Sequence, residues 1–284
     1  MAGMIARLNW RDFHAFAVRP LPVPIVAGRR VRAGASFGAV GMKLLAIDCA
    51  TEQMNLALVA GDSDTVLNAE GGALSSARLI PALLGLLDRA GLRVADLDAI
   101  AFGQGPGAFT GLRTAASVAQ GLAFGAGLPV LAIDSLLIVA EDLRHSLARA
   151  GAAASGVEGL WVAMDARIEQ VYAAAYRHDG QAWQVEQVPA LYDLGELLSL
   201  WRAHPPRHLA GSALAAFGER LPVEAAAIAP PTADRAAALA RLARAAWRAG
   251  AVLPAEQALP LYLRDKVAQT SAEREALRVA RGWS

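Results

Sequence analysis

The stretch LLAIDCATEQMNLALVA at residues 44–60 decides the fold, because a variant of it returns as LWVAMDARIEQVYAAAY at residues 160–176. Each copy begins with an apolar run that ends in an aspartate, Asp48 or Asp165. Aligning these two aspartates also superimposes two Glu-Gln dipeptides without a gap. The pattern predicts a strand, a turn and a second strand in each copy, and therefore a duplicated unit.

The segments around the two copies extend the repeat. Apolar periodicity and turn residues predict three strands in the same order at the start of each half, followed in the first half by helices and further strands. The expected strands are 44–47, 55–60, 65–69, 99–102, 130–133, 160–164, 171–176 and 183–188, and the expected helices are 76–90, 112–124 and 136–150. The sequence thus predicts an α/β protein with two similar β-β-β-α-β-α halves. Two such halves resemble the actin-like architecture of sugar kinases, Hsp70 and actin.

This architecture suggests a division of the chain into lobes. We expect residues 42–150 to form the first lobe and residues 151–254 the second, with a C-terminal helix at 255–284 returning to the first. Residues 1–41 stand apart, because they carry six arginines against one aspartate and show no periodicity. We expect them to be a non-core extension upstream of a true start near Met42; a basic nucleic-acid arm is the alternative.

Composition excludes several classes of protein. With 55% hydrophobic and 19% charged residues, the chain is expected to bury a core rather than remain disordered. A single cysteine, Cys49, rules out an internal disulfide framework and a cysteine-based zinc site. The single cysteine also fits a reducing cytoplasm, which is the location that we expect. The longest apolar run, 121–133, is interrupted by glycines and a proline, so we expect no membrane span.

A glycine-rich loop, GQGPGAFTGLR at residues 103–113, joins a predicted strand to a predicted helix. Backbone N–H groups in that setting bind anions, although glycines also serve in a tight turn. The two interpretations are equally well supported by spacing. The residues of the candidate vestigial nucleotide or anion site are Asp48, Thr51, Gly105, Gly107, Thr110, Gly111 and Arg113.

Other features bear on enzymatic function. Cys49 and Ala50 carry Cβ atoms where an actin-like phosphate loop needs glycine. Asp48 and Asp165 would be the acids of a nucleotide-dependent kinase or phosphatase, which is one alternative. A loose G-x-G-x-x-A pattern with Asp134 beyond it makes a dinucleotide-binding enzyme another. His204 and His208 have the i, i+4 spacing of a zinc-binding helix, but the two prolines between them forbid that helix. No nucleophile elbow occurs, so we predict no catalytic residue, metal or cofactor.

Two predicted helices carry apolar stripes wider than one sheet contact requires. They indicate either packing within the chain or an interface with a partner. The candidate interface residues are Leu79, Ile80, Leu83, Leu86, Leu87, Ala115, Ala119 and Leu122.

Four motifs in order resemble one family. They are LAIDCATE at 45–52, GPGAFTGLR at 105–113, MDAR at 164–167 followed by Val171-Tyr172, and PLYLRD at 260–265 followed by Val267-Ala268. Together they resemble the TsaB (YeaZ-like) family, with Ala108 where its glycine motif has serine. The first helix also departs from the family, because it opens with Ser75-Ser76 where members often have His-Ser.

The resemblance implies a non-catalytic, actin-like subunit of a tRNA-modifying complex. The subunit would pair with the catalytic subunit TsaD through the two helices and with the ATPase TsaE, or form a homodimer when alone. It would contact tRNA only through the complex. TsaD would transfer threonylcarbamoyl to the adenosine beside the anticodon in tRNAs that read ANN codons.

Overall fold

The computed structural model describes residues 41–72, 75–151, 157–221, 227–228 and 234–264. The predictions for residues 1–40 and for a helix at 265–284 therefore lie outside the described residues. Within the described part, none of the helices combines the length and hydropathy that a membrane span requires.

Two five-stranded sheets form the framework, and they have the same topology. The first has the order β3-β2-β1-β4-β5, and the second has the order β8-β7-β6-β9-β10 when read from the equivalent edge. The strands are β1 (Lys43–Asp48), β2 (Gln53–Ala60), β3 (Ser63–Glu70), β4 (Ala99–Gly105), β5 (Val130–Asp134), β6 (Val157–Asp165), β7 (Gln170–His178), β8 (Trp183–Asp193), β9 (His208–Ala210) and β10 (Ala227–Ile228). The matching order confirms the duplicated unit and the actin-like fold predicted from the repeat.

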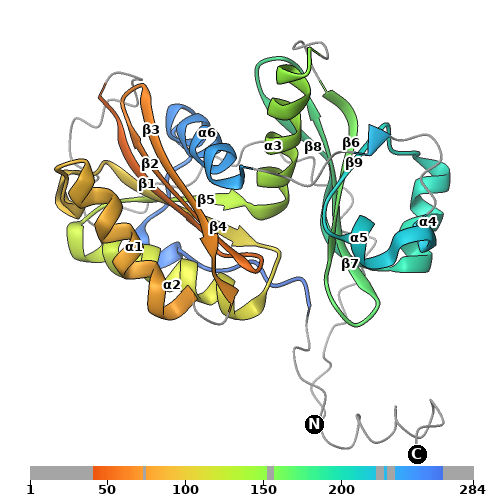
Figure 1. Cartoon of the computed structure of the whole chain (residues 1–284), viewed down its shortest axis with the longest axis horizontal. Helices are drawn as coiled ribbons and strands as arrows, with labels where there is room; N and C mark the ends of the chain where they lie inside the picture. Colours follow the sequence, from red (N-terminus) through yellow and green to blue (C-terminus); the bar gives the residue numbers. More distant parts are fainter. Residues whose placement is uncertain (1–40, 73–74, 152–156, 222–226, 229–233, 265–284) are drawn as a thin grey trace, which may run out of the picture. The chain divides into compact units, whose positions relative to one another are not determined.

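Helices cover both faces of the first sheet and separate the two sheets (Figure 1). Helices α1 and α2 pack on one face of the first sheet and α6 on the other, while α3 packs on the inner face of the second sheet. The α-helices are α1 (Ser75–Arg89), α2 (Phe109–Ala126), α3 (Ser135–Arg149), α4 (Leu194–Ala203), α5 (Ala213–Phe217) and α6 (Arg235–Arg248). The described residues also include the 3₁₀ turns η3 (Val94–Asp96), η4 (Gly218–Arg220) and η5 (Ala255–Gln257).

The central strand β1 shows why the first copy of the repeat is almost wholly apolar. Leu45 and Ile47 point toward α1 and α2, whereas Leu44 and Ala46 point toward α6. The strand is antiparallel to β2 and parallel to β4, so it has a neighbour on each side. A strand buried on both faces needs a continuous apolar run instead of an alternating one.

Helix α6 differs from the division expected from sequence. It falls inside residues 151–254, which were assigned to the second lobe, but its alanines and leucines are buried against β1 and β2 of the first sheet. The apolar stripe of α6 completes the second face of that sheet, so the chain returns to the first lobe earlier than expected. Residues 255–264 form η5 and then an irregular segment rather than the expected helix, because Pro260 has no backbone N–H to donate within a helix.

Candidate functional site

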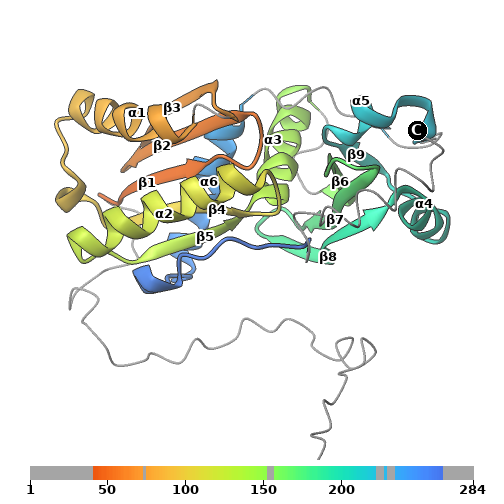
Figure 2. The same cartoon turned by 90° about the horizontal axis from the view of Figure 1, so that it is seen from below.

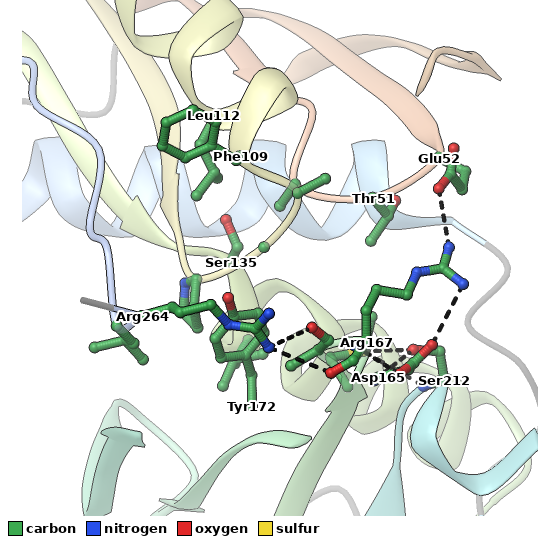
Figure 3. A pocket seen from close by; sticks show the side chains of 18 of the residues that line it. Thr51, Glu52, Phe109, Leu112, Ser135, Asp165, Arg167, Tyr172, Ser212 and Arg264 are labelled. Carbon is green, nitrogen blue, oxygen red and sulfur yellow. Dashed lines mark hydrogen bonds and ion pairs between the residues drawn. The ribbon is translucent and has the colours of Figure 1, made fainter. Parts of the chain in front are cut away.

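A cavity of about 640 Å³ lies where the carboxyl ends of β1, β4 and β6 meet residues 261–264 (Figure 3). All four sequence motifs contribute to its wall, through residues such as Ala50, Phe109, Asp165 and Arg264. In open α/β sheets the carboxyl ends of the strands are where ligands usually bind. The cavity is therefore where the predicted vestigial site must be tested.

Asp48 does not face this cavity, because its side chain is wholly buried. Its carboxylate accepts a hydrogen bond from the Ser135 hydroxyl at 2.9 Å and forms an ion pair with Arg235 at 3.1 Å. A buried carboxylate is stabilised only when it is paired and hydrogen-bonded. The geometry therefore ties β1 to α3 and α6 and leaves no Asp48 oxygen exposed to hold a metal ion or a phosphate-bound water.

The glycine-rich loop packs directly on the turn after β1. The N–H of Ala108 donates to the carbonyl of Ala50 at 2.8 Å. A Cβ atom built on Gly107 would lie 2.4 Å from that carbonyl oxygen, and one on Gly111 would lie 1.8 Å from the carbonyl oxygen of Cys49. These glycines thus permit close contact between two segments of the same chain. Carbonyl oxygens occupy the space where an anion would need donors, so the geometry favours the tight-turn interpretation.

The remaining residues of the candidate anion site also bind their own chain. The Thr51 hydroxyl accepts from the N–H of Gln53 at 3.2 Å, and the carbonyl of Thr110 accepts from the next turn of α2. Gly105 has φ +112°, a conformation that favours glycine, and its N–H donates to the Ser135 hydroxyl. These contacts hold the loop in place without a ligand.

Arg113 is held in an aromatic cluster. Its guanidinium carbon lies 3.9 Å from the centre of the Phe109 ring, and its Nε donates to the Tyr262 hydroxyl at 2.9 Å. The rings of Phe109 and Tyr262 are 5.1 Å apart. The planar guanidinium therefore stacks on α2's first aromatic residue and contacts the closing segment. Sequence reasoning placed Arg113 in the anion site and did not identify Tyr262 as its partner.

The candidate interface helices divide into a buried part and an exposed edge. Six of the predicted residues are at most 2% exposed and lie in the chain's own core between the helices and the first sheet: Leu79, Leu83, Leu86, Leu87, Ala115 and Ala119. Leu122 is half-buried, whereas Ile80 is 47% exposed. Leu84, one turn after Ile80, is 50% exposed, and Phe124 on α2 is also exposed. The six are core positions because the sheet already covers that side of the stripe.

Two polar clusters connect the lobes through α3. Asp134 accepts hydrogen bonds from the Tyr176 hydroxyl at 2.6 Å and from the N–H of Leu136 at 2.8 Å. Burial raises the pKa of Asp134 to about 6, although these hydrogen bonds act in the opposite direction. Asp134, the candidate ribose-binding acid, therefore caps α3 and binds the second lobe.

Glu141 is the centre of the other cluster. Its buried carboxylate accepts from the Arg144 side chain, from Arg241 of α6 at 2.6 Å and from the indole N–H of Trp183 at 2.9 Å. Burial by itself would raise the pKa of Glu141, but the hydrogen bonds from these partners outweigh it and hold the pKa below its usual value. The carboxylate thus joins α3, α6 and the edge strand β8.

Asp165, the equivalent of Asp48 in the second lobe, is bound in the turn that follows β6. Its carboxylate accepts from the N–H of Arg167 at 2.8 Å, and its own N–H donates to the Ser212 hydroxyl at 3.0 Å. Among the described residues, no group of three or more His, Cys, Asp or Glu side chains is arranged to bind a metal ion.

Comparison with known proteins supplies a family. Residues 66–233 match the family model described as TsaD, tRNA N6-adenosine threonylcarbamoyltransferase. The tRNA threonylcarbamoyladenosine biosynthesis protein TsaB of Haemophilus influenzae is 35% identical over 57% of this chain and 61% of its own. The Escherichia coli protein of the same name is 29% identical over 80% of this chain and 96% of its own. The chain thus spans about three fifths of the first relative and nearly all of the second.

A solved structure has the same fold over its whole length. YeaZ from Pseudomonas aeruginosa is 35% identical and superimposes with a TM-score of 0.67. The match covers 78% of this chain and 100% of that one.

Proposed function

Since the chain belongs to the TsaB (YeaZ) family of tRNA threonylcarbamoyladenosine biosynthesis proteins, we propose that it is a non-catalytic subunit that binds and activates TsaD. In this proposal TsaD carries out the transfer of threonylcarbamoyl to the adenosine beside the anticodon of tRNAs reading ANN codons. The chain supplies a scaffold in the cytoplasm, contacts tRNA only within the complex, and also meets the ATPase TsaE.

The observation that supports a non-catalytic role is that the end of β1, the turn after it and the glycine-rich loop bind other parts of the same chain. Asp48 forms an ion pair with Arg235, and the carbonyl oxygen of Ala50 accepts a hydrogen bond from the glycine-rich loop. Phosphoryl-transfer sites need the opposite arrangement, with N–H donors and an exposed acid that holds magnesium. The cavity beside these elements is therefore not equipped to position the phosphates and metal of a nucleotide.

The exposed edge of α1 and α2 supports a role in partner binding. Ile80 and Leu84 are one turn apart and face solvent. On α2, a Cβ atom built on Gly121 or Gly125 would meet nothing within 4 Å, so the chain's own packing does not require glycine at either position. Small residues beside exposed apolar ones let another helix approach closely. We propose that a helix pair of TsaD covers this edge, and that a second copy of the chain does so when TsaD is absent.

Reconstitution with the cognate partners tests the proposal. The full chain, TsaD and TsaE are combined with threonylcarbamoyl-adenylate, ATP and unmodified tRNA, and each protein is omitted in turn. We expect modification to be lost without the chain, and the chain alone to turn over no ATP. Undiminished modification in its absence contradicts the scaffold role. ATP turnover by the purified chain that disappears in Asp48→Ala contradicts the non-catalytic role.

A further inference from the structure

The last described segment of the chain is anchored to the first lobe. The N–H of Leu261 donates to the carbonyl of Gln104 at 2.6 Å. The Tyr262 ring packs on Phe109, and its hydroxyl accepts a hydrogen bond from Arg113. Just before it, the side chain of Gln120 on α2 donates to the carbonyl of Glu256. Figure 2 shows this segment, in dark blue, leaving the 3₁₀ turn and running along the first lobe toward the second sheet.

The same segment ends on the second lobe. The Nη2 atom of Arg264 lies 2.8 Å from the carbonyl oxygen of Ala166, 2.9 Å from Oε1 of Gln170 and 3.3 Å from the carbonyl oxygen of Arg167 (Figure 3). Hydrogen bonds from a charged donor are stronger than neutral ones. Residues 259–264, called the strap below, therefore contact both lobes and form part of the cavity wall.

The turn that Arg264 holds has an unfavourable backbone. Arg167, Ile168 and Glu169 have φ values of +63°, +55° and +59°. The left-handed conformation costs a non-glycine residue about 1–2 kcal/mol. Such a conformation persists only where surrounding contacts stabilise it, and the Arg264 guanidinium binds carbonyls at the start of this turn.

Another contact between the lobes beside the cavity is weaker. Arg167 pairs with Glu52 at 3.2 Å, but the two side chains are 72% and 77% exposed. Exposed ion pairs contribute little, because water and salt screen them. On the side away from the strap, α3 joins the lobes through Tyr176–Asp134 and Trp183–Glu141 (Figure 2). Among the described residues, the strap thus makes the stronger connection between the two lobes on the side of the cavity away from α3.

We propose that the strap is a clamp that holds the two lobes at a fixed angle, so that the cavity does not open and close as a hinge. Two bodies joined only along α3 would be free to rotate about it, whereas a second crossing on the far side prevents that rotation. The clamp also links α2, through Phe109 and Arg113, to the turn after β6. The inference does not depend on which partner binds the protein.

Distances between the lobes test the clamp. Spin labels are placed on Ser63→Cys in the β2–β3 hairpin and Ser199→Cys on α4, both exposed, while the buried Cys49 stays unlabelled. Pulsed dipolar spectroscopy should give one narrow distance distribution for the parent chain. Tyr262→Ala and Arg264→Ala, each of which removes one anchor, should broaden and shift it.

A matched control separates clamping from loss of charge. Arg207→Ala removes an exposed arginine that pairs with Glu158 inside the second lobe, so its distribution should match the parent. In the same variants, amide hydrogen exchange at Ala166 and Gln170 should rise about tenfold when Arg264 is removed and stay unchanged for Arg207→Ala. If Arg264→Ala does not fold, Tyr262→Ala carries the distance test. Parent-like distances in the strap variants overturn the proposal.

Discussion

The carboxylate of Asp48, at the end of β1, forms a buried ion pair with the guanidinium of Arg235, the first residue of α6, although the two residues are 187 positions apart. Ser135 joins the pair, because its hydroxyl donates to Asp48 and its carbonyl lies 3.5 Å from Arg235. The first strand of the fold, the start of α3 and the start of the returning helix are thus held at one point. In an actin-like enzyme the corresponding strand end would help to bind a ligand.

Removing one member of this pair should destabilise the protein strongly. Arg235→Ala leaves the Asp48 carboxylate buried without its counter-ion, which costs about 3–5 kcal/mol. Urea denaturation followed by circular dichroism measures the loss. The matched control is Arg207→Ala, whose pair with Glu158 is exposed and whose removal should change the free energy of unfolding by less than about 1 kcal/mol. Equal effects of the two changes would show that the pair is not a structural centre.

The two sides of α1 should respond differently to a charge. Leu84→Glu should leave the fold and most of the melting temperature intact but weaken TsaD binding at least tenfold, because an interface charge must be desolvated without a partner. Leu83→Glu, one residue away and 1% exposed, should unfold the chain. A pull-down and far-UV circular dichroism distinguish the outcomes. A folded Leu84→Glu variant that binds TsaD normally would place the interface elsewhere.

The partly buried Asp134 should make stability depend on pH. Its pKa is about 6 in the folded chain, above its ordinary value, because burial disfavours the ionised form. The unfolded chain therefore releases this proton first, and the folded state loses stability as pH rises from about 4 to 6. The loss is about 2–3 kcal/mol.

Asp134→Asn isolates this contribution from other carboxylates. The variant cannot ionise at position 134, so its free energy of unfolding should rise relative to the parent as pH increases from 4 to 6, and the difference should be constant above that window. Urea titrations at pH steps of 0.5 follow the difference. A difference that does not change with pH contradicts a raised pKa for Asp134.

Two glycines of α2 should respond to alanine in opposite directions. Gly111→Ala places a Cβ 1.8 Å from the carbonyl oxygen of Cys49, which forces the glycine loop away from the turn after β1. We expect a loss of stability of about 1–3 kcal/mol from overpacking. Gly121→Ala meets nothing within 4 Å and should stabilise the helix by about 0.5–1 kcal/mol. Thermal unfolding of both variants gives the sign of each change.

The three strands that open each half could be predicted from the sequence because their determinants are local, whereas α4, β9, α5, β10 and α6 were not predicted. Each copy of the repeat carries its own apolar strands, turn residues and terminal aspartate, and these features depend on neighbours only a few residues apart. The duplicated order of strands follows directly. That the four motifs meet at one cavity was not predicted, because they come from two different sheets and from the irregular segment 260–264.

Which surface each side chain meets was decided only by the tertiary structure. An apolar stripe on α1 indicates that another surface covers the helix. Leu83 and Leu84 are adjacent, however, and only packing on the first sheet determines which of them is buried. The partner of Asp48 comes from 187 positions away and Arg264 binds a turn 94–98 positions earlier, so neither contact leaves a periodic trace. The local pattern encodes the strands and helices, whereas the pairing of buried charges depends on contacts that exist only after the chain has folded.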